Sequence, residues 1–173
     1  MFGLTTLGTI HTLISIVAVV GGFVALAQGG AISTRTTAGR TFVIGTVLTC
    51  LTGFGIFQHG GFGNPHALAI VTLAVLAAAY AGELAKFGRS SRYVAVLGYS
   101  FSLFLHFIPA TVETLTRLPV AAPYLANPDD PKAQPIIGMF LAIFVVGAVV
   151  QFLRLKKMRA ADLIDPDAGT TPG

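Results

Sequence analysis

The chain has 173 residues, of which 54% are hydrophobic and only 10% are charged. Soluble domains carry about 25% charged residues, so this composition excludes an ordinary water-soluble protein. The formal net charge of +4 does not indicate nucleic-acid binding, because the basic residues flank apolar segments and form no basic stripe on a polar face.

Four stretches contain no charged residue, and they have the dimensions of membrane spans. They are residues 1–34, 41–82, 93–112 and 133–153. A bilayer-spanning helix needs about 20 mainly apolar residues, so the second stretch holds two spans and each of the others holds one. Alternation of apolar and polar residues with period 2 is absent, and spanning backbone is therefore expected to be helical.

The sequence thus predicts an all-α integral membrane protein, a five-span transmembrane helix bundle. The expected helices, in chain order, cover residues 4–28, 41–58, 66–86, 93–117 and 135–155. They are joined by short loops rich in turn formers and form a single transmembrane domain, residues 1–159. The rest of the chain, residues 160–173, is predicted to be a disordered cytoplasmic tail, since it holds three aspartates, two prolines and no aromatic residue.

Basic residues collect on one side of this predicted bundle. Nine of them fall in the first loop, around the third loop, or after the last helix: Arg35, Arg40, Lys86, Arg89, Arg92, Arg154, Lys156, Lys157 and Arg159. The second loop has no charge, and the fourth carries both signs. Because Lys and Arg concentrate on the cytoplasmic side, we expect the N-terminus out, the C-terminus in, and a location in a bacterial-type plasma (inner) membrane.

The first apolar segment also ends on Ala25-Leu26-Ala27, which resembles the small-residue cleavage site of a secretory signal. No Lys or Arg precedes that segment. A basic loop follows it, so we expect the segment to be retained as the first helix.

Histidines are the main candidates for function. In the predicted orientation, all four, His11, His59, His66 and His106, fall at or outward of the midplane. Ionisable side chains inside spans are costly and usually mark a pathway or a bound group. Glu113 lies two turns beyond His106. The structural alternative for Glu113 is an ion pair with Arg117 at i+4. Glu83 is interpreted as a solvated partner of Lys86.

Small and polar residues form stripes that favour an interior site. Residues three, four and seven apart share a helix face. The stripes are Gly98, Ser102, His106, Pro109, Glu113 and Arg117 on the fourth predicted helix; Gly8, His11, Thr12, Ser15, Ala18 and Gly22 on the first; and Gly45, Thr49, Thr52 and His59 on the second. We expect these stripes to face one another around a shared outer cavity, which His66 joins. The fifth helix, with no polar residue before Gln151, is predicted to be peripheral.

The ligand types suggest two cofactors. Neutral imidazoles with one carboxylate suit Zn, Cu or Fe, and the candidate metal ligands are His11, His59, His66, His106 and Glu113. A b-type haem needs two axial histidines, which His11 or His59 could provide together with His106. Gly53 and Gly55 could let the porphyrin approach the helices. The aromatic walls could come from phenylalanines at the same depth: Phe54, Phe57, Phe101, Phe104 and Phe107. The candidate cofactor-binding set is His11, His66 and His106. For each histidine the alternative is a hydrogen bond to Thr, Ser or backbone across the bundle.

Other chemistry has little support. The sequence has no phosphate loop, no G-x-S-x-G elbow, no H-E-x-x-H and no C-x-x-C-H, which favours a non-enzymatic role. Its single cysteine, Cys50, excludes a disulfide within the chain and a Cys-based metal site.

Several segments give the chain a family resemblance. These are His11, the loop Arg35-Thr36-Thr37-Ala38-Gly39-Arg40 with Thr41-Phe42-Val43 after it, the segment Leu48-Thr49-Cys50-Leu51-Thr52-Gly53, and His66. Over about residues 5–110 the chain resembles the small bacterial predicted membrane proteins called domain of unknown function 2306. Members often carry a His just before the first Arg of that loop, where this chain has Thr34 or Arg35. The resemblance implies no settled activity, but such histidine-bearing bundles are similar to b-type cytochromes, an analogy that favours haem.

Three functions remain open from the sequence. One is an outer-half histidine site that holds haem b or a transition metal in a redox or metal-handling role. Another is a cofactor-free transporter or permease-like protein that uses His and Glu as a proton or solute relay. The third is a structural accessory subunit of a membrane complex. The expected partners are the lipid bilayer and either a second copy of the chain or another subunit of a membrane complex, and no nucleic acid.

Overall fold

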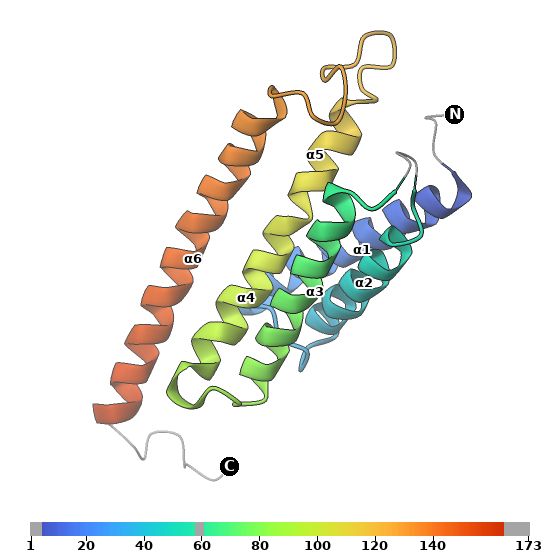
Figure 1. The fold of residues 1–173 in the computed structure, drawn as a ribbon. Helices are drawn as coiled ribbons and strands as arrows, with labels where there is room; N and C mark the ends of the chain where they lie inside the picture. The colour runs from blue at the N-terminus through green and yellow to red at the C-terminus, as the bar shows by residue number, and fades with distance from the viewer. Residues whose placement is uncertain (1–4, 58–60, 165–173) are drawn as a thin grey trace.

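A computed structural model of the chain describes residues 5–57 and 61–164, and the regular elements within them are all helical. They are α1 (Thr6–Gly29), α2 (Thr37–Gly53), α3 (Asn64–Glu83), the short 3₁₀ helix η1 (Gly88–Ser90), α4 (Ser91–Leu105), α5 (Phe107–Leu115) and α6 (Ala133–Ile164). Figure 1 shows an elongated bundle in which α5 continues α4 and α6 lies at one edge. The all-α prediction is confirmed.

Four helical segments are long and apolar enough to cross a membrane: Thr6–Gly29, Asn64–Glu83, Gly88–Leu115 and Ala133–Arg159. With 17 residues, α2 is shorter. Large apolar side chains remain exposed on α1 and α6, as at Val17 (56%) and Val146 (65%). An apolar surface of this kind is typical of helices that face lipid, and these helices indicate a membrane protein.

The bounds of α2 differ from the predicted helix 41–58. The helix begins at Thr37 because the hydroxyl of Thr36 caps it, accepting from the backbone N–H of Gly39 at 3.1 Å. It ends at Gly53, in a segment that also contains Gly55, and the chain continues without helix to Phe57. The sequence prediction started at the charge-free stretch after Arg40 and so missed the cap.

The predicted helix 93–117 is divided in two. The break falls at His106, between α4 and α5, three residues before Pro109. Proline has no N–H to donate, and its ring clashes with the carbonyl four residues earlier, here that of Leu105. The last helix is longer than the predicted 135–155, because α6 continues through the basic segment to Ile164. Residues 160–164, predicted to be part of a disordered tail, are therefore helical, and the rest of that predicted tail, from 165 onward, lies outside the described residues.

The bundle is built from two antiparallel helix pairs. Within the first pair, a Cβ at Gly45 would lie 2.8 Å from the Cβ of Ala18, so only glycine lets α2 approach α1 this closely. The pairs meet at a core that contains Phe42, Leu76, Tyr99 and Leu103. The predicted facing of the small-residue stripes on the first two helices is confirmed by the Ala18–Gly45 contact.

As predicted, α6 is peripheral, and it packs on α4 and α5 through aromatic rings. The ring centroids of Phe107 and Phe140 are 4.7 Å apart, and Phe144 stacks on Phe104 at 5.6 Å. Gln151 anchors the helix: its amide oxygen accepts from the hydroxyl of Ser100 at 2.9 Å, and its amide nitrogen donates to the carbonyl of Gly30 at 3.0 Å. Phe104 and Phe107 thus bind α6 rather than line an open cofactor pocket.

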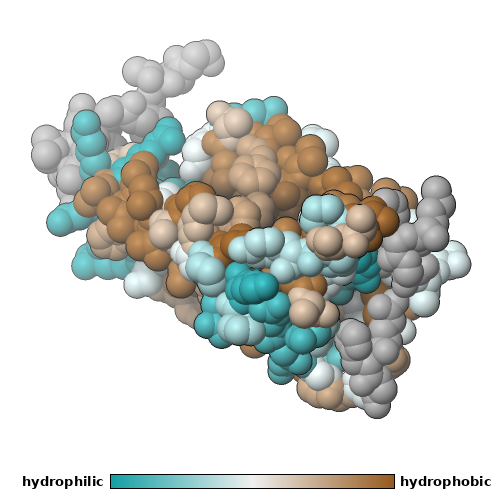
Figure 2. All heavy atoms as spheres, turned by 90° about the horizontal axis from the view of Figure 1, so that it is seen from above, coloured by the Kyte–Doolittle hydropathy of each residue, from teal (hydrophilic) through white to brown (hydrophobic). Residues whose placement is uncertain are grey.

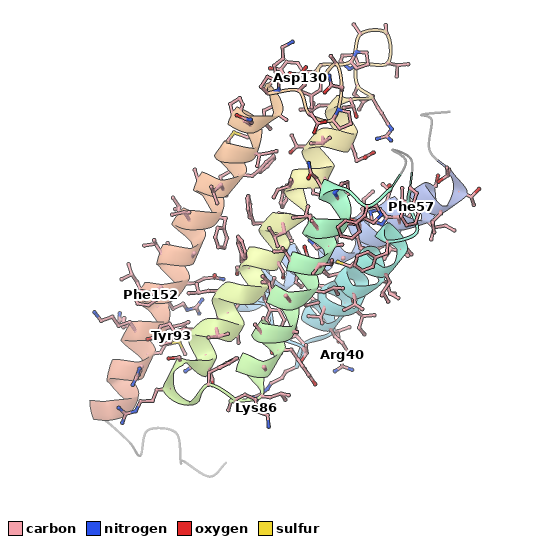
Figure 3. The ribbon with its side chains drawn as sticks, viewed as in Figure 1. Arg40, Phe57, Lys86, Tyr93, Asp130 and Phe152 are labelled. Atoms are coloured by element: carbon pink, nitrogen blue, oxygen red, sulfur yellow. The ribbon has the colours of Figure 1, made fainter. Side chains whose placement is uncertain are left out.

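The two ends of the bundle differ in charge. Figure 3 places Arg40 and Lys86 at one end and Asp130 at the other. Figure 2 looks onto the end that carries Asp130, where hydrophilic residues gather in a patch flanked by hydrophobic surface. This agrees with the expected separation of the basic loops from the fourth loop.

Candidate functional site: a histidine and threonine track

His106 is buried at the junction of α4 and α5, with both ring nitrogens engaged. Nδ1 lies 2.9 Å from the carbonyl oxygen of Ser102, and Nε2 lies 3.4 Å from the hydroxyl oxygen of Thr46 on α2. A carbonyl can only accept, so Nδ1 carries the proton. In the neutral ring Nε2 then accepts from the Thr46 hydroxyl, across the interface between the two helix pairs.

His11 makes the equivalent contact from α1. Its Nδ1 lies 3.1 Å from the hydroxyl oxygen of Thr52. That hydroxyl points its hydrogen back into α2, because it lies 2.8 Å from the carbonyl of Leu48 and 3.0 Å from that of Thr49. The oxygen of Thr52 is therefore left to accept from Nδ1–H, and Nε2 of His11 keeps its lone pair.

A row of threonines on α2 connects the two histidines. Thr46, Thr49 and Thr52 are three residues apart, so each is a neighbour of the next on the helix surface, and the row turns by about 120° around the helix between Thr46 and Thr52. Thr46 is fully buried, and Thr49 is 8% exposed. The hydroxyl of Thr49 has no hydrogen-bond partner among the described residues. We call the set His11, Thr52, Thr49, Thr46 and His106 the His–Thr track.

Glu113 lies on α5, which follows His106 along the chain. It forms an ion pair with Arg117 one turn along the chain, as its spacing predicted, and it also interacts electrostatically with His11. His11 and His106 interact electrostatically as well. Three of the predicted site residues are therefore brought into one region.

His66 lies instead in an aromatic box in the first turn of α3. Its ring stacks with those of Phe54, Phe57 and Phe62, at centroid distances of 6.4, 5.0 and 5.2 Å. Nδ1 accepts from the backbone N–H of Gly63 at 3.2 Å, while the buried Nε2 has no partner in the described part of the chain. Two phenylalanines that the sequence suggested as porphyrin walls thus pack on this histidine.

The predicted metal site does not assemble within the described residues. No group of three or more His, Cys, Asp or Glu side chains there is placed to hold a metal ion. His59 lies outside the described residues. Two cavities of the structure run along the seam of α1 and α2, and no histidine lines either of them.

A carboxylate network at the basic end was missed by the sequence reasoning. Glu83 accepts from the hydroxyls of Ser33 and Thr34, from the backbone N–H of Thr34 at 3.0 Å, and from the hydroxyl of Tyr99 at 2.7 Å. The interpretation of Glu83 as a solvated partner of Lys86 is wrong, because neutral donors from another loop and from α4 surround the carboxylate.

A local signal for this network was present in the sequence. Glu83 is the last residue of α3, where the negative end of the helix dipole disfavours a carboxylate. Donors from elsewhere were therefore to be expected, and Ser33-Thr34 is the hydroxyl pair of the loop at the same end.

No protein-family model, curated protein or solved structure matches the chain. The resemblance to the domain of unknown function 2306 family stays a prediction.

Proposed function

We propose that the chain is a cofactor-free, multi-pass membrane protein of the transporter type, in which the His–Thr track relays protons through one half of the bundle. The observation that carries this proposal is the pairing of two histidines, from α1 and from the α4–α5 junction, with hydroxyls of one threonine row on α2 at 3.1 and 3.4 Å. Histidine is the side chain that most readily gains and loses a proton near neutral pH.

The spacing of the hydroxyls suits a relay. Residues three apart on a helix have Cβ atoms about 5–6 Å apart, which one water molecule bridging two hydroxyls spans. The unpartnered hydroxyl of Thr49 is the middle group of the relay, between those of Thr46 and Thr52. A buried hydroxyl without a partner costs roughly 1–3 kcal/mol, a cost that a role in transfer would justify.

An apolar layer separates the track from the carboxylate network. Phe42, which is fully buried, lies against His106 with ring centroids 5.9 Å apart, and Leu103 is 4% exposed. Beyond this layer Tyr99 donates to Glu83 at the basic end. We infer that a proton held on the track passes Phe42 only when the layer opens, so that Glu83 receives it on the other side.

The membrane arrangement that this function requires has five spans, with the N-terminus out and the C-terminus in, in the plasma (inner) membrane. Although α2 is short, its contacts with α1 extend from Ala18–Gly45 to His11–Thr52. A helix paired over that length follows α1 across the bilayer. The basic end, with Arg40 and Lys86, then faces the cytoplasm by the positive-inside rule.

A matched pair of Thr→Val substitutions tests the relay. Thr72, on α3, is buried like Thr49, but its hydroxyl donates only to the carbonyl of Leu68 in its own helix, at 2.8 Å. In proteoliposomes with an internal pH-sensitive dye, Thr49→Val is expected to reduce proton flux about a hundredfold, the lower end of what one positioned proton-transfer group contributes, and Thr72→Val to leave it unchanged. Equal flux in both variants and the wild type would contradict the relay.

The haem and metal alternatives lack a supporting observation of this kind. They are tested directly by an absorption spectrum and by metal analysis of the purified protein. The relay account predicts neither a Soret band nor stoichiometric metal, and finding either one would replace the account with the cofactor-binding prediction on His11, His66 and His106. A purely structural subunit would show no flux, and His11→Ala with His106→Ala would leave its complex active.

A further inference from the structure

A groove on the outside of the bundle joins an apolar channel to a cluster of polar side chains. Two cavities, of about 600 and 360 Å³, lie along the seam of α1 and α2. They share Val17, Thr37 and Thr41, so they form one surface, which we call the α1–α2 groove. Because α1 and α2 are antiparallel, the groove runs along the bundle from the basic end towards mid-depth.

The deeper part of the α1–α2 groove is lined by exposed aliphatic side chains. Val17 and Val20 of α1 are 56% and 55% exposed, and Ile44 and Leu48 of α2 are 53% and 44% exposed. Four aliphatic side chains left open at this depth suit a hydrocarbon chain, which needs no hydrogen bond from the wall.

The end of the groove at the first loop has the opposite character. It is lined by four residues with polar side chains, Gln28, Thr37, Arg40 and Thr41. The side chain of Arg40 donates from Nε to the carbonyl of Thr34 at 3.4 Å, and its terminal guanidinium nitrogens make no hydrogen bond to another described residue. No hydrogen bond from either threonine hydroxyl to another described residue is present.

The charges at this end select an anion. No acidic side chain lines the groove, and the carboxylate of Glu83, at the end of α3, accepts hydrogen bonds from Ser33, Thr34 and Tyr99. A guanidinium with hydroxyl donors beside it is the donor set that binds phosphate. Phosphate at the end of an aliphatic channel is the chemistry of a phospholipid.

We propose that the α1–α2 groove binds one anionic phospholipid, with the phosphate at Arg40, Thr37 and Thr41 and an acyl chain along Val17, Val20, Ile44 and Leu48. The proposal rests on the membrane placement given above and is independent of the relay, since the groove contains no residue of the His–Thr track. Basic residues near a membrane surface are commonly attracted to anionic lipid; here the apolar groove makes the contact site-specific.

The experiment measures lipid retained by the purified chain, by native mass spectrometry after exchange in equimolar phosphatidylglycerol and phosphatidylcholine. The wild type is expected to retain one phosphatidylglycerol molecule in preference to phosphatidylcholine. Arg40→Gln should reduce that preference roughly fivefold or more, the effect of one basic residue near anionic lipid. The matched control is Arg92→Gln, an exposed arginine of α4 at the same end that lies outside the groove.

A second pair of variants tests the groove itself. Val20→Trp fills it and should also remove the retained lipid, whereas Val146→Trp, on the exposed face of α6, should not. The proposal is overturned by equal retention of the two lipids, by an equal loss in Arg92→Gln, or by competition from inorganic phosphate alone. It is also overturned if Val20→Trp changes the oligomeric state and leaves lipid retention intact, because a second copy would then cover the groove. None of these readouts depends on proton flux.

Discussion

The hydroxyl of Tyr99 gives the sharpest test of the carboxylate network. Tyr99 is fully buried, and its hydroxyl donates to Oε2 of Glu83 at 2.7 Å. Hydrogen bonds to charged groups contribute about 1.5–3 kcal/mol, whereas interhelical bonds in membrane proteins average about 0.6 kcal/mol and reach about 1.7 kcal/mol. Because the acceptor is a carboxylate, we expect Tyr99→Phe to lower the free energy of unfolding by about 1.5 kcal/mol, near the point where the two ranges meet.

The assay is reversible unfolding in mixed micelles as the fraction of denaturing detergent rises, followed by circular dichroism. The matched control is Tyr93→Phe at the same end, because Tyr93 uses its ring, stacked on Phe152 at a centroid distance of 5.2 Å. If Tyr99 stabilises the fold through Glu83, Tyr99→Phe lowers the free energy of unfolding much less in the Glu83→Gln background than in the wild type. A Tyr99→Phe variant as stable as Tyr93→Phe, or full additivity with Glu83→Gln, would refute the reasoning.

Three further predictions concern other parts of the structure. Gly30 has a left-handed φ of 70°, so Gly30→Ala should cost about 1–2 kcal/mol in the same unfolding assay, whereas Gly29→Ala, at a helical position with no neighbour within 4 Å, should be neutral or stabilising; equal effects would contradict this assignment. Phe42→Ala should cost about 3–5 kcal/mol, as for other buried aromatic residues, and a loss below 1 kcal/mol would show that the core packs otherwise. The backbone N–H groups of Ala126 and Lys132 lower the pKa of Asp130, so the stabilisation that they provide is present above the ordinary pKa of Asp and is lost as pH falls through the lowered value; an NMR titration midpoint at or above the ordinary value would contradict it.

The fold prediction was based on the positions of the charged residues. The charge-free stretches predicted helical segments in the correct order, because the cost of burying charge in lipid makes charged residues rare within membrane spans. The ends of the helices were less accurate, since capping is decided by hydrogen bonds of single residues such as Thr36. The extension of α6 to Ile164 was missed because charged residues mark the end of an apolar span, whereas a helix can continue beyond that end.

The candidate site was predictable only in part. Shared helix faces placed His11 and His106 towards α2, as the threonine contacts at 3.1 and 3.4 Å bear out. Periodicity shows which residues share a face of one helix, but it does not show how that helix is rotated relative to its neighbours. It therefore could not separate His66, which stacks on phenylalanines, from the other two, nor bring Ser33 and Tyr99 to Glu83.

The proposed relay requires His106 to take part in proton transfer along the His–Thr track. The most direct measurement is pH-dependent proton flux into proteoliposomes containing metal-free protein, with the wild type compared with His106→Ala and with Thr72→Val as the control. We expect flux above that of empty liposomes, loss of both the flux and its pH dependence in His106→Ala, and no change in Thr72→Val. Flux in His106→Ala equal to that of the wild type would contradict it.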